Sequence, residues 1–271
     1  MRVGFIGLGS QGAPMARRIV EAGFATTLWA RRPAALEPFA ETPAILAASP
    51  AELAAECDLV CLCVVGDADV EELTFGENGL LAGLQPGAVI AVHSTVHPNT
   101  CRDIAEKAST QGISILDAPV SGGGPAAAAG RLLVMVGGDA DVVARCRPVF
   151  ETHSDAVVHL GDLGSGQTTK LLNNLLFTAN LGTAAAALAL ADNLGVSPTR
   201  LAEVVSRSSG NSFALNSIGK TGGLERLAGL AGTLLQKDVR LLVDLAERAS
   251  ASGGAALAAA DAALAQMDVA R

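Results

Sequence analysis

The segment GDLGSGQTTKLLNN, residues 161–174, holds the residues best suited to chemistry. Its three glycines allow a sharp turn, and the polar Gln-Thr-Thr that follows can open a helix. Lys170 and Asn174 are four residues apart, so in a helix they share one face. An ammonium and an amide on that face can converge on one small polar ligand. The alternative interpretation of Lys170 is an ordinary solvated lysine in a first helical turn.

A second glycine-rich segment follows the apolar strand that we expect over residues 2–6. It matches G-x-G-x-x-G: the first glycine makes the turn, the second admits a pyrophosphate close to the backbone, and the third lets helix and strand pack. A helix to Glu21 and a strand over residues 25–30 complete the pattern. A purely structural turn is the alternative. We therefore predict a dinucleotide site at Gly7, Leu8, Gly9, Ser10, Gln11 and Gly12.

The end of the strand over residues 25–30 bears on which dinucleotide binds. NAD-preferring sites usually place a carboxylate about 20 residues beyond the glycines, where it binds the ribose 2′-hydroxyl. This sequence has Arg31 and Arg32 there. Because guanidinium groups bind phosphate through paired hydrogen bonds, we predict NADP(H) as the preferred cofactor, with NAD(H) also usable. Two solvated arginines before Pro33 are the alternative.

Further strands are expected over residues 59–65, 89–92, 113–117, 132–136 and 157–160. In a parallel sheet the dinucleotide lies along the carboxyl ends of the strands. Val64 and Val65 are therefore expected beside the adenosine or ribose, and the hydroxyls of Ser94 and Thr95 beside the ribose or nicotinamide. His93 and His97 have no convergent partners, so we favour loop or supporting roles over acid-base or metal chemistry.

The segment after residues 113–117 contains Ser121, Gly122, Gly123 and Gly124. We expect these residues to form a loop whose backbone amides could bind a carboxylate. A plain turn is the alternative.

Residues 33–56 read as a helix-turn-helix crossover with a capping box from Ser49 to Glu52. Downstream, helices are expected over residues 168–194, 197–206, 233–251 and 255–267. Residues 208–229 read as a lid, a rim or a mere connector.

The composition limits the functional classes. A net charge of −8 and a pI near 5.0 argue against nucleic acid or an anionic membrane surface as a partner. Residues 171–194 are apolar but carry asparagines and an aspartate, which predicts a core helix and no membrane span. The five cysteines show neither a disulfide framework nor zinc-ligand spacing, and we predict no metal site. With no secretory signal before the first strand, we predict a cytoplasmic protein.

Four motifs resemble, in their order and spacing, those of the β-hydroxyacid dehydrogenase family, which includes 3-hydroxyisobutyrate dehydrogenases and tartronate semialdehyde reductases and is related to 6-phosphogluconate dehydrogenase. They are GLGSQGAPMA, DAPVSGGGPAAAAG, GDLGSGQTTKLLNN and the Lys237-Asp238 pair, and they span nearly the whole chain. The resemblance implies an α/β fold with an N-terminal Rossmann-type domain, a long interdomain helix and an all-α C-terminal domain. We expect the NAD(P)-binding domain over residues 1–163 and the helical substrate and oligomerisation domain over residues 164–271.

The resemblance also implies roles for individual residues. Lys170 is similar to the catalytic lysine of the family, and Asn174 to the asparagine that helps hold the substrate. The Ser121 to Gly123 loop is similar to the one that grips the substrate carboxylate. Thr95 and Lys237 are then cofactor contacts. The implied reaction is hydride transfer between NADP(H) and a small β-hydroxyacid or its semialdehyde, by a homodimer or homotetramer.

Three positions depart from the family pattern: Gln11 replaces a usual Met, Ala30 a common Asn, and Leu230 a Phe found in many members. These changes affect the expected cofactor cleft and substrate pocket, so the identity of the substrate does not transfer. Two other functions stay open, namely an imine or other C=N reductase and a non-catalytic dinucleotide-binding protein. The related imine reductases usually lack the lysine, so Lys170 favours alcohol and carbonyl chemistry.

Overall fold

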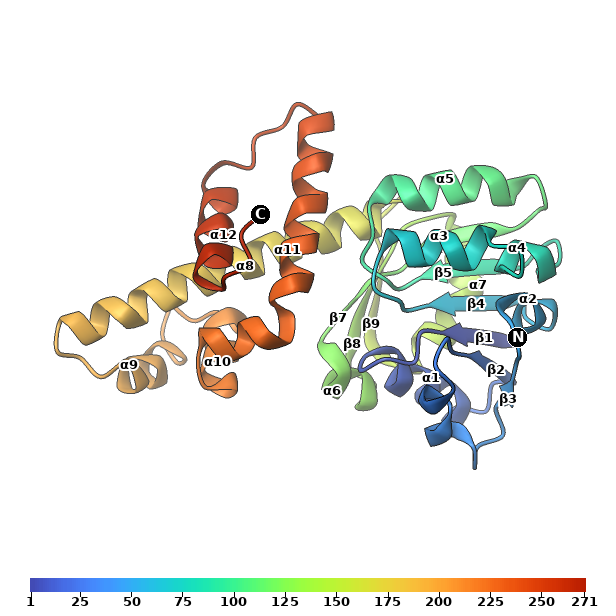
Figure 1. The fold of residues 1–271 in the computed structure, drawn as a ribbon, viewed down its shortest axis with the longest axis horizontal. Coiled ribbons are helices and arrows are strands. Elements are labelled where there is room, and N and C mark those ends of the chain that lie inside the picture. Colours follow the sequence, from blue (N-terminus) through green and yellow to red (C-terminus); the bar gives the residue numbers. More distant parts are fainter. The chain divides into compact units, whose positions relative to one another are not determined.

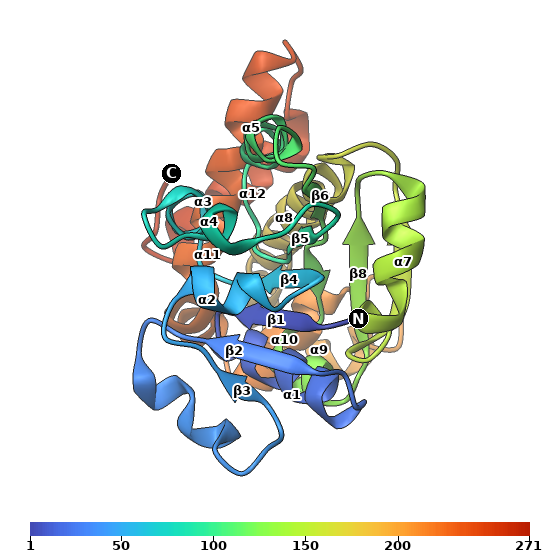
Figure 2. The same cartoon turned by 90° about the vertical axis from the view of Figure 1, so that its right-hand side faces the viewer.

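A six-stranded parallel sheet with the order β3-β2-β1-β4-β5-β6 forms the centre of the N-terminal part of the chain (Figure 1 and Figure 2). The computed structural model describes residues 1–271, and the chain divides into two units, Met1–Lys170 and Leu171–Arg271. The winding of the sheet reverses between β1 and β4, and the carboxyl ends of these strands therefore mark the expected ligand crevice. The strands are β1 (Val3–Ile6), β2 (Thr26–Trp29), β3 (Ile45–Leu46), β4 (Leu59–Leu62), β5 (Val89–Val92) and β6 (Ser114–Asp117).

Alternate residues of these strands enter two separate cores. In β1, Val3 and Phe5 pack on one face of the sheet and Ile6 packs on the other. Figure 1 shows α1 on one side of the sheet and α3, α4 and α5 on the other. Because both faces are covered, the strands read as continuous apolar runs. The covering helices are α1 (Gly12–Glu21), α2 (Pro50–Ala55), α3 (Asp67–Phe75), α4 (Leu80–Gly83), α5 (Pro98–Ser109) and α7 (Ala140–Phe150).

A smaller sheet follows β6. In it, β8 (Leu132–Val136) pairs antiparallel with β7 (Val120–Ser121) and parallel with β9 (Ser154–His159). A bridge between Asp117 and Gly137 joins it to the end of β6. The predicted loop at residues 121–124 was wrong in part, because Ser121 pairs with Leu133 as a strand and Gly123 begins the short helix α6 (Gly123–Ala128).

Residues 33–56 do not form the predicted helix-turn-helix. They contain two 3-10 turns, η1 (Pro33–Ala35) and η2 (Glu37–Phe39), then the edge strand β3 and helix α2. Recurrent prolines explain the difference, because each one removes a backbone donor and ends a helix that approaches it. The capping interactions of α2 are confirmed: Glu52 N donates to Ser49 Oγ at 3.1 Å, and Ala48 N donates to Glu52 Oε2 at 2.9 Å.

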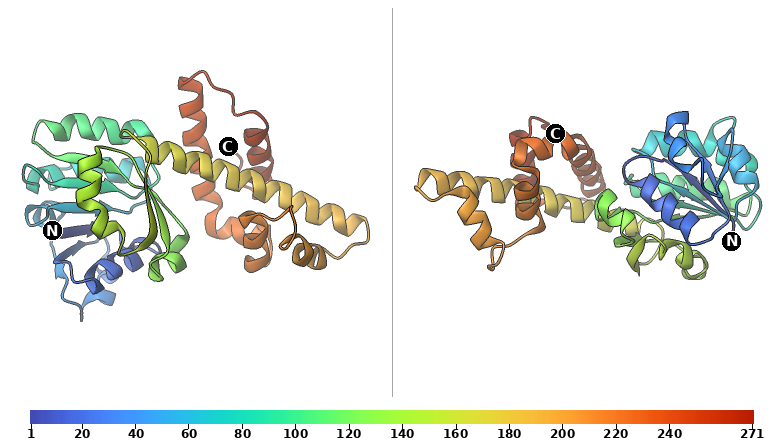
Figure 3. Two further views of the ribbon diagram at one scale, coloured as in Figure 1. Left: turned by 180° about the vertical axis from the view of Figure 1, so that it is seen from behind. Right: turned by 90° about the horizontal axis from the view of Figure 1, so that it is seen from below.

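The second unit contains only helices, as the sequence predicts. Helix α8 (Ser165–Asn193) is one uninterrupted helix (Figure 3), and its Leu171 and Leu175 lie in the core of this unit. Most of the stretch over residues 208–229 is helical, and its Ile218 and Leu227 are buried in the core of this unit, so it is not a loose connector. The remaining helices are α9 (Pro198–Val205), α10 (Phe213–Thr221), α11 (Leu224–Arg248) and α12 (Gly254–Gln266).

Helix α8 is long and apolar enough to cross a membrane by length and composition alone. Three of its polar side chains, however, those of Gln167, Asn174 and Thr178, are buried with partners inside the protein. Thr178 Oγ1 donates to the carbonyl of Asn174 at 2.8 Å, and Gln167 bonds the backbone of the first unit. These contacts support the predicted core helix, since buried polar groups need such partners.

Candidate active site

The glycine turn after β1 leaves space for a ligand directly against the backbone. Gly7 has a φ of 101°, and a Cβ atom there would collide with the carbonyl of Cys63. A Cβ at Gly12 would collide with the Gly7 carbonyl, so only glycine lets α1 start this close to β1. At Gly9 a Cβ would have no neighbouring atom within 4 Å, which is the open position of the turn.

The start of α1 favours an anion. Its first turn contains no acidic residue, and its N-cap residue, Gln11, forms no capping hydrogen bond with its side chain. Gln11 Nε2 is buried without a hydrogen-bond partner. Leu8 is buried beside the turn, and Ser10 is exposed. Because the N–H groups and the positive end of a helix attract negative charge, residues 7–12 fit the pyrophosphate of a dinucleotide.

Arg31, just after β2, forms ion pairs with two carboxylates that were not predicted from the sequence. Its guanidinium group forms ion pairs with Asp69 Oδ1 at 3.0 Å and Glu72 Oε2 at 3.1 Å, both on α3. Arg32 is exposed. The two carboxylates would compete for Arg31 with any phosphate group that bound there, and exposed ion pairs of this kind are weak enough to exchange.

The residues expected along the cofactor path lie at the carboxyl ends of β4 and β5. Val64 N donates to Ser94 Oγ at 2.8 Å, so Ser94 connects the two strand ends. Val65 is 65% exposed, which leaves its side chain able to cover a ligand. Thr95 is half-buried in the loop after β5. These residues share the sheet edge with the glycine turn, since Cys63 N donates to Ile6 O at 2.9 Å.

The Ser121 to Gly123 segment lies next to the glycine turn. Gly122 and Gly123 have φ angles of 133° and 73°, in the region that favours glycine. A Cβ on Gly124 would lie 2.5 Å from the carbonyl oxygen of Ser10, so the segment runs closely against the turn. The residues expected to bind a carboxylate and those expected to bind a pyrophosphate are therefore neighbours.

Asp117 and Gln167 fix the start of α8, which carries Lys170. Buried Asp117 accepts hydrogen bonds from Gly164 N on Oδ1 and from Gln167 N on Oδ2, both at 2.7 Å. The side chain of Gln167 donates to Ser94 O at 2.7 Å and accepts from Val96 N at 3.1 Å. Burial raises the pKa of Asp117, and these N–H donors oppose that increase.

In the second unit, Asn174 belongs to a polar cluster on α8 and α11. Asn174 Nδ2 donates to Asp238 Oδ2 at 2.6 Å, and Asn173 Nδ2 donates to Asn174 Oδ1 at 3.0 Å. Lys237 Nζ lies 2.8 Å from Asp238 Oδ1. Asp238 is only 5% exposed, so the pair does not lie on a solvated face. The structure thus brings two expected site residues, Asn174 and Lys237, to one carboxylate.

The histidines near the sheet have structural contacts instead of a place in the site. His93 Nδ1 lies 2.7 Å from the carbonyl oxygen of Ala118, and its ring packs against Phe150 and His153. Burial lowers the pKa of His93 to about 4. His97 caps α5 by accepting a hydrogen bond from Asn99 N at 3.1 Å.

Two family models together cover nearly the whole chain. Residues 2–161 match the model described as the NAD-binding domain of 6-phosphogluconate dehydrogenase. Residues 164–270 match the model described as NAD-binding of NADP-dependent 3-hydroxyisobutyrate dehydrogenase.

Relatives of known name agree with these models. The chain is 36% identical to 3-hydroxyisobutyrate dehydrogenase of Pseudomonas aeruginosa over 258 residues, 92% of this chain and 87% of the relative. It is 34% identical to the NAD-dependent L-serine dehydrogenase of the same organism over 259 residues, 93% and 87% of the two chains. The solved structure of 3-hydroxyisobutyrate dehydrogenase from Salmonella typhimurium matches with a TM-score of 0.85 at 30% identity, over 99% of this chain and 93% of that one. The chain therefore belongs to the β-hydroxyacid dehydrogenase family and is an oxidoreductase that uses a nicotinamide dinucleotide.

Proposed function

We propose that the protein transfers a hydride between NADP(H) and a small β-hydroxyacid or its semialdehyde, with Lys170 as the general acid and base. The observation that carries this proposal is the attachment of the first turn of α8, which precedes Lys170 directly, to the ends of β5 and β6. These ends belong to the edge that holds the glycine turn. Relatives named for 3-hydroxyisobutyrate, L-serine and L-threonate support a small hydroxyacid as the substrate.

The roles follow from the chemistry of each group. The bound dinucleotide supplies or accepts the hydride. Backbone amides of the Ser121 to Gly123 segment bind the substrate carboxylate and so orient the carbonyl, which accounts for much of the rate gain in such reactions. In reduction the Lys170 ammonium donates a proton to the alkoxide that develops at the carbonyl oxygen. In oxidation the neutral amine accepts that proton. Asn174 holds the hydroxyl group, and Lys237 contacts the cofactor.

The preference for NADP(H) rests on Arg31 and Arg32. Bidentate hydrogen bonds make a guanidinium group a good partner for a 2′-phosphate, and no carboxylate follows β2 directly. Arg31 leaves Asp69 and Glu72 when the phosphate binds. A lower KM for NADH than for NADPH would contradict the preference.

The domain boundary and the assembly belong to the same proposal. The gap between the two matched family models, at residues 162–163, supports a boundary between residues 163 and 164. We further propose a homodimer or homotetramer in the cytoplasm. Sedimentation of the purified protein tests the subunit count.

The test is the consumption of NADPH, and separately of NADH, with tartronate semialdehyde, methylmalonate semialdehyde, succinic semialdehyde and glyoxylate. We expect turnover with at least one of them, and a loss of most of kcat in Lys170→Ala with NADPH affinity nearly unchanged. Turnover retained in Lys170→Ala would refute the role of this lysine. Tight NADPH binding without turnover on any of them would favour a C=N substrate or a non-catalytic protein.

A further inference from the structure

The start of α8 is fastened to the sheet at four backbone positions. The Asp117 carboxylate uses one oxygen for Gly164 N and the other for Gln167 N, while the Gln167 amide bonds Ser94 O and Val96 N. Asp117 is the last residue of β6, and Ser94 and Val96 flank Thr95 after β5. Two side chains thus tie one helix to the carboxyl ends of two neighbouring strands.

The packing around the Asp117 carboxylate leaves no room for another arrangement. A Cβ at Gly166 would lie 2.9 Å from Asp117 Oδ2, and a Cβ at Gly137 would collide with Oδ1. Asp117 and Gln167 are both fully buried. An enclosed carboxylate with one N–H on each oxygen holds the helix start in one orientation, because any rotation of the helix would leave a buried group without its partner.

Lys170 follows Gln167 by three residues, which corresponds to about 4.5 Å along the helix axis and about 60° short of a full turn. Gln167 faces the sheet edge, so the rotation of α8 set by Gln167 also sets the direction in which Lys170 leaves the helix. A misplacement of about 1 Å at a reacting group costs about 100-fold in rate. The hydrogen bonds that hold the start of α8 in place are therefore expected to affect the rate of a reaction that uses Lys170.

We propose that Asp117 and Gln167 are positioning residues for Lys170: they fix the start and the rotation of α8, and thereby the place of the ammonium relative to the strand ends that carry Thr95 and Ser121. This inference rests on the proposed function of Lys170. Neither side chain reacts, and both act through the helix.

The test uses Gln167→Met, which keeps the length of the side chain but removes its donor and its acceptor. We expect kcat to fall about 10- to 100-fold, and to fall by a much larger factor than the Kd for NADPH rises, because the glycine turn is untouched and only the loop around Thr95 loses two bonds. In the double variant with Lys170→Ala, we expect no further fall beyond that of Lys170→Ala alone, since groups that act as a unit are non-additive. Fluorescence of the single tryptophan, Trp29, verifies the fold of the first unit in each variant.

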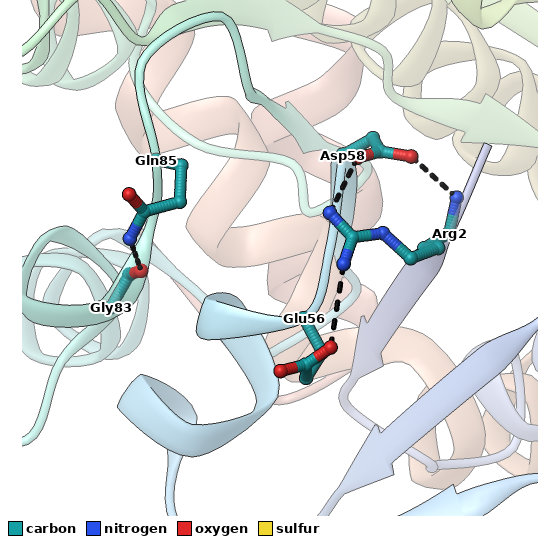
Figure 4. A network of polar contacts seen from close by, with 5 residues as sticks. All are labelled: Arg2, Glu56, Asp58, Gly83 and Gln85. Atoms are coloured by element: carbon teal, nitrogen blue, oxygen red, sulfur yellow. Dashed lines mark hydrogen bonds and ion pairs between the residues drawn. The ribbon is translucent and has the colours of Figure 1, made fainter.

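The matched control is Gln85→Met. Gln85 lies in the same unit and donates to the carbonyl of Gly83 at 3.1 Å (Figure 4), and its replacement should leave kcat within about twofold. Asp117→Asn is the second variant, because it keeps the shape of the carboxylate while it removes one of the two acceptors; the same fall in kcat is expected.

The outcomes separate the two proposals. If Lys170→Ala is inactive but Gln167→Met and Asp117→Asn keep full kcat, only the positioning role is overturned. A further fall in the double variant below Lys170→Ala also overturns it, because the loss is then general and structural. If the unmodified protein shows no turnover that depends on Lys170, the proposed function fails and this inference fails with it.

Discussion

Burial of His93 should make the first unit sensitive to mild acid. The ring is 2% exposed and packs between aromatic side chains, and burial lowers its pKa from 6.5 to about 4. Its Nδ1 donates to the Ala118 carbonyl, so Nε2, which has no partner, must take up the proton that charges the ring. The pKa of neighbouring His153 is also lowered, first by burial and then by the charges of His93 and Arg18.

The sign of the effect follows from proton linkage. Because the folded pKa lies below the unfolded one, the unfolded chain binds more protons between these values. The stability that neutral His93 contributes is present above about pH 6.5 and is lost as the pH falls toward about 4. One pKa unit corresponds to about 1.4 kcal/mol, so the full loss is roughly 3 kcal/mol, of which about 2 kcal/mol falls between about pH 7 and about pH 5.

The assay is urea unfolding at these two pH values, followed by the fluorescence of Trp29, which lies in β2 and so reports the first unit alone. In His93→Asn the amide can keep the bond to Ala118 but cannot be charged. Its loss of stability on acidification should be smaller than that of the unmodified protein by about 2 kcal/mol. The pKa of Asp117 is raised, so its contribution to stability changes in the opposite direction and grows as the pH falls. Both proteins contain Asp117, so this contribution cancels when their losses of stability are compared.

Val143→Ala is the control, because Val143 lies buried in the same core and does not titrate. It should lower stability by a similar amount at each pH. The reasoning fails if His93→Asn loses as much stability between the two pH values as the unmodified protein does.

Three further predictions follow from the site. Glu72→Gln frees Arg31 from one carboxylate, so the KM for NADPH should fall about two- to fivefold while that for NADH is unchanged, as initial rates with each cofactor would show. Gly12→Ala places a methyl group on the Gly7 carbonyl, so fluorescence titration should give a Kd for NADPH raised at least about tenfold. Asp238→Asn removes the charge that holds Lys237 and weakens the acceptor of Asn174, so kcat/KM should fall about tenfold in steady-state assays.

Local sequence predicted much of the fold and part of the candidate site. The strands that lead to the glycine turn and to Ser94 are short apolar runs, so their places in the chain could be predicted, as could the helix that follows the glycine turn. The order of the strands in the sheet and most of the helices that cover it could not be predicted in this way. Residues 33–56 could not, because the proline spacing permits either short helices or turns, and packing decides between them. The prediction of a loop at Gly123 was wrong for a related reason. Glycines indicate a turn, and only the tertiary structure shows that a helix begins there.

The contacts that could not be predicted from the sequence are those between a carboxylate and donors that lie far from it along the chain. Asp117 lies 47 and 50 positions from its two donors, and Asn174 lies 64 positions from Asp238. No local pattern distinguishes such carboxylates from solvated ones, since charged residues are usually exposed. What distinguishes them is burial: a carboxylate enclosed by the protein needs donors for its oxygens, and here those donors include Gln167 and Asn174 of α8. The same physical requirement therefore explains why Asp117 and Asp238 could not be assigned from sequence and why each fixes a part of the helix that carries Lys170 and Asn174.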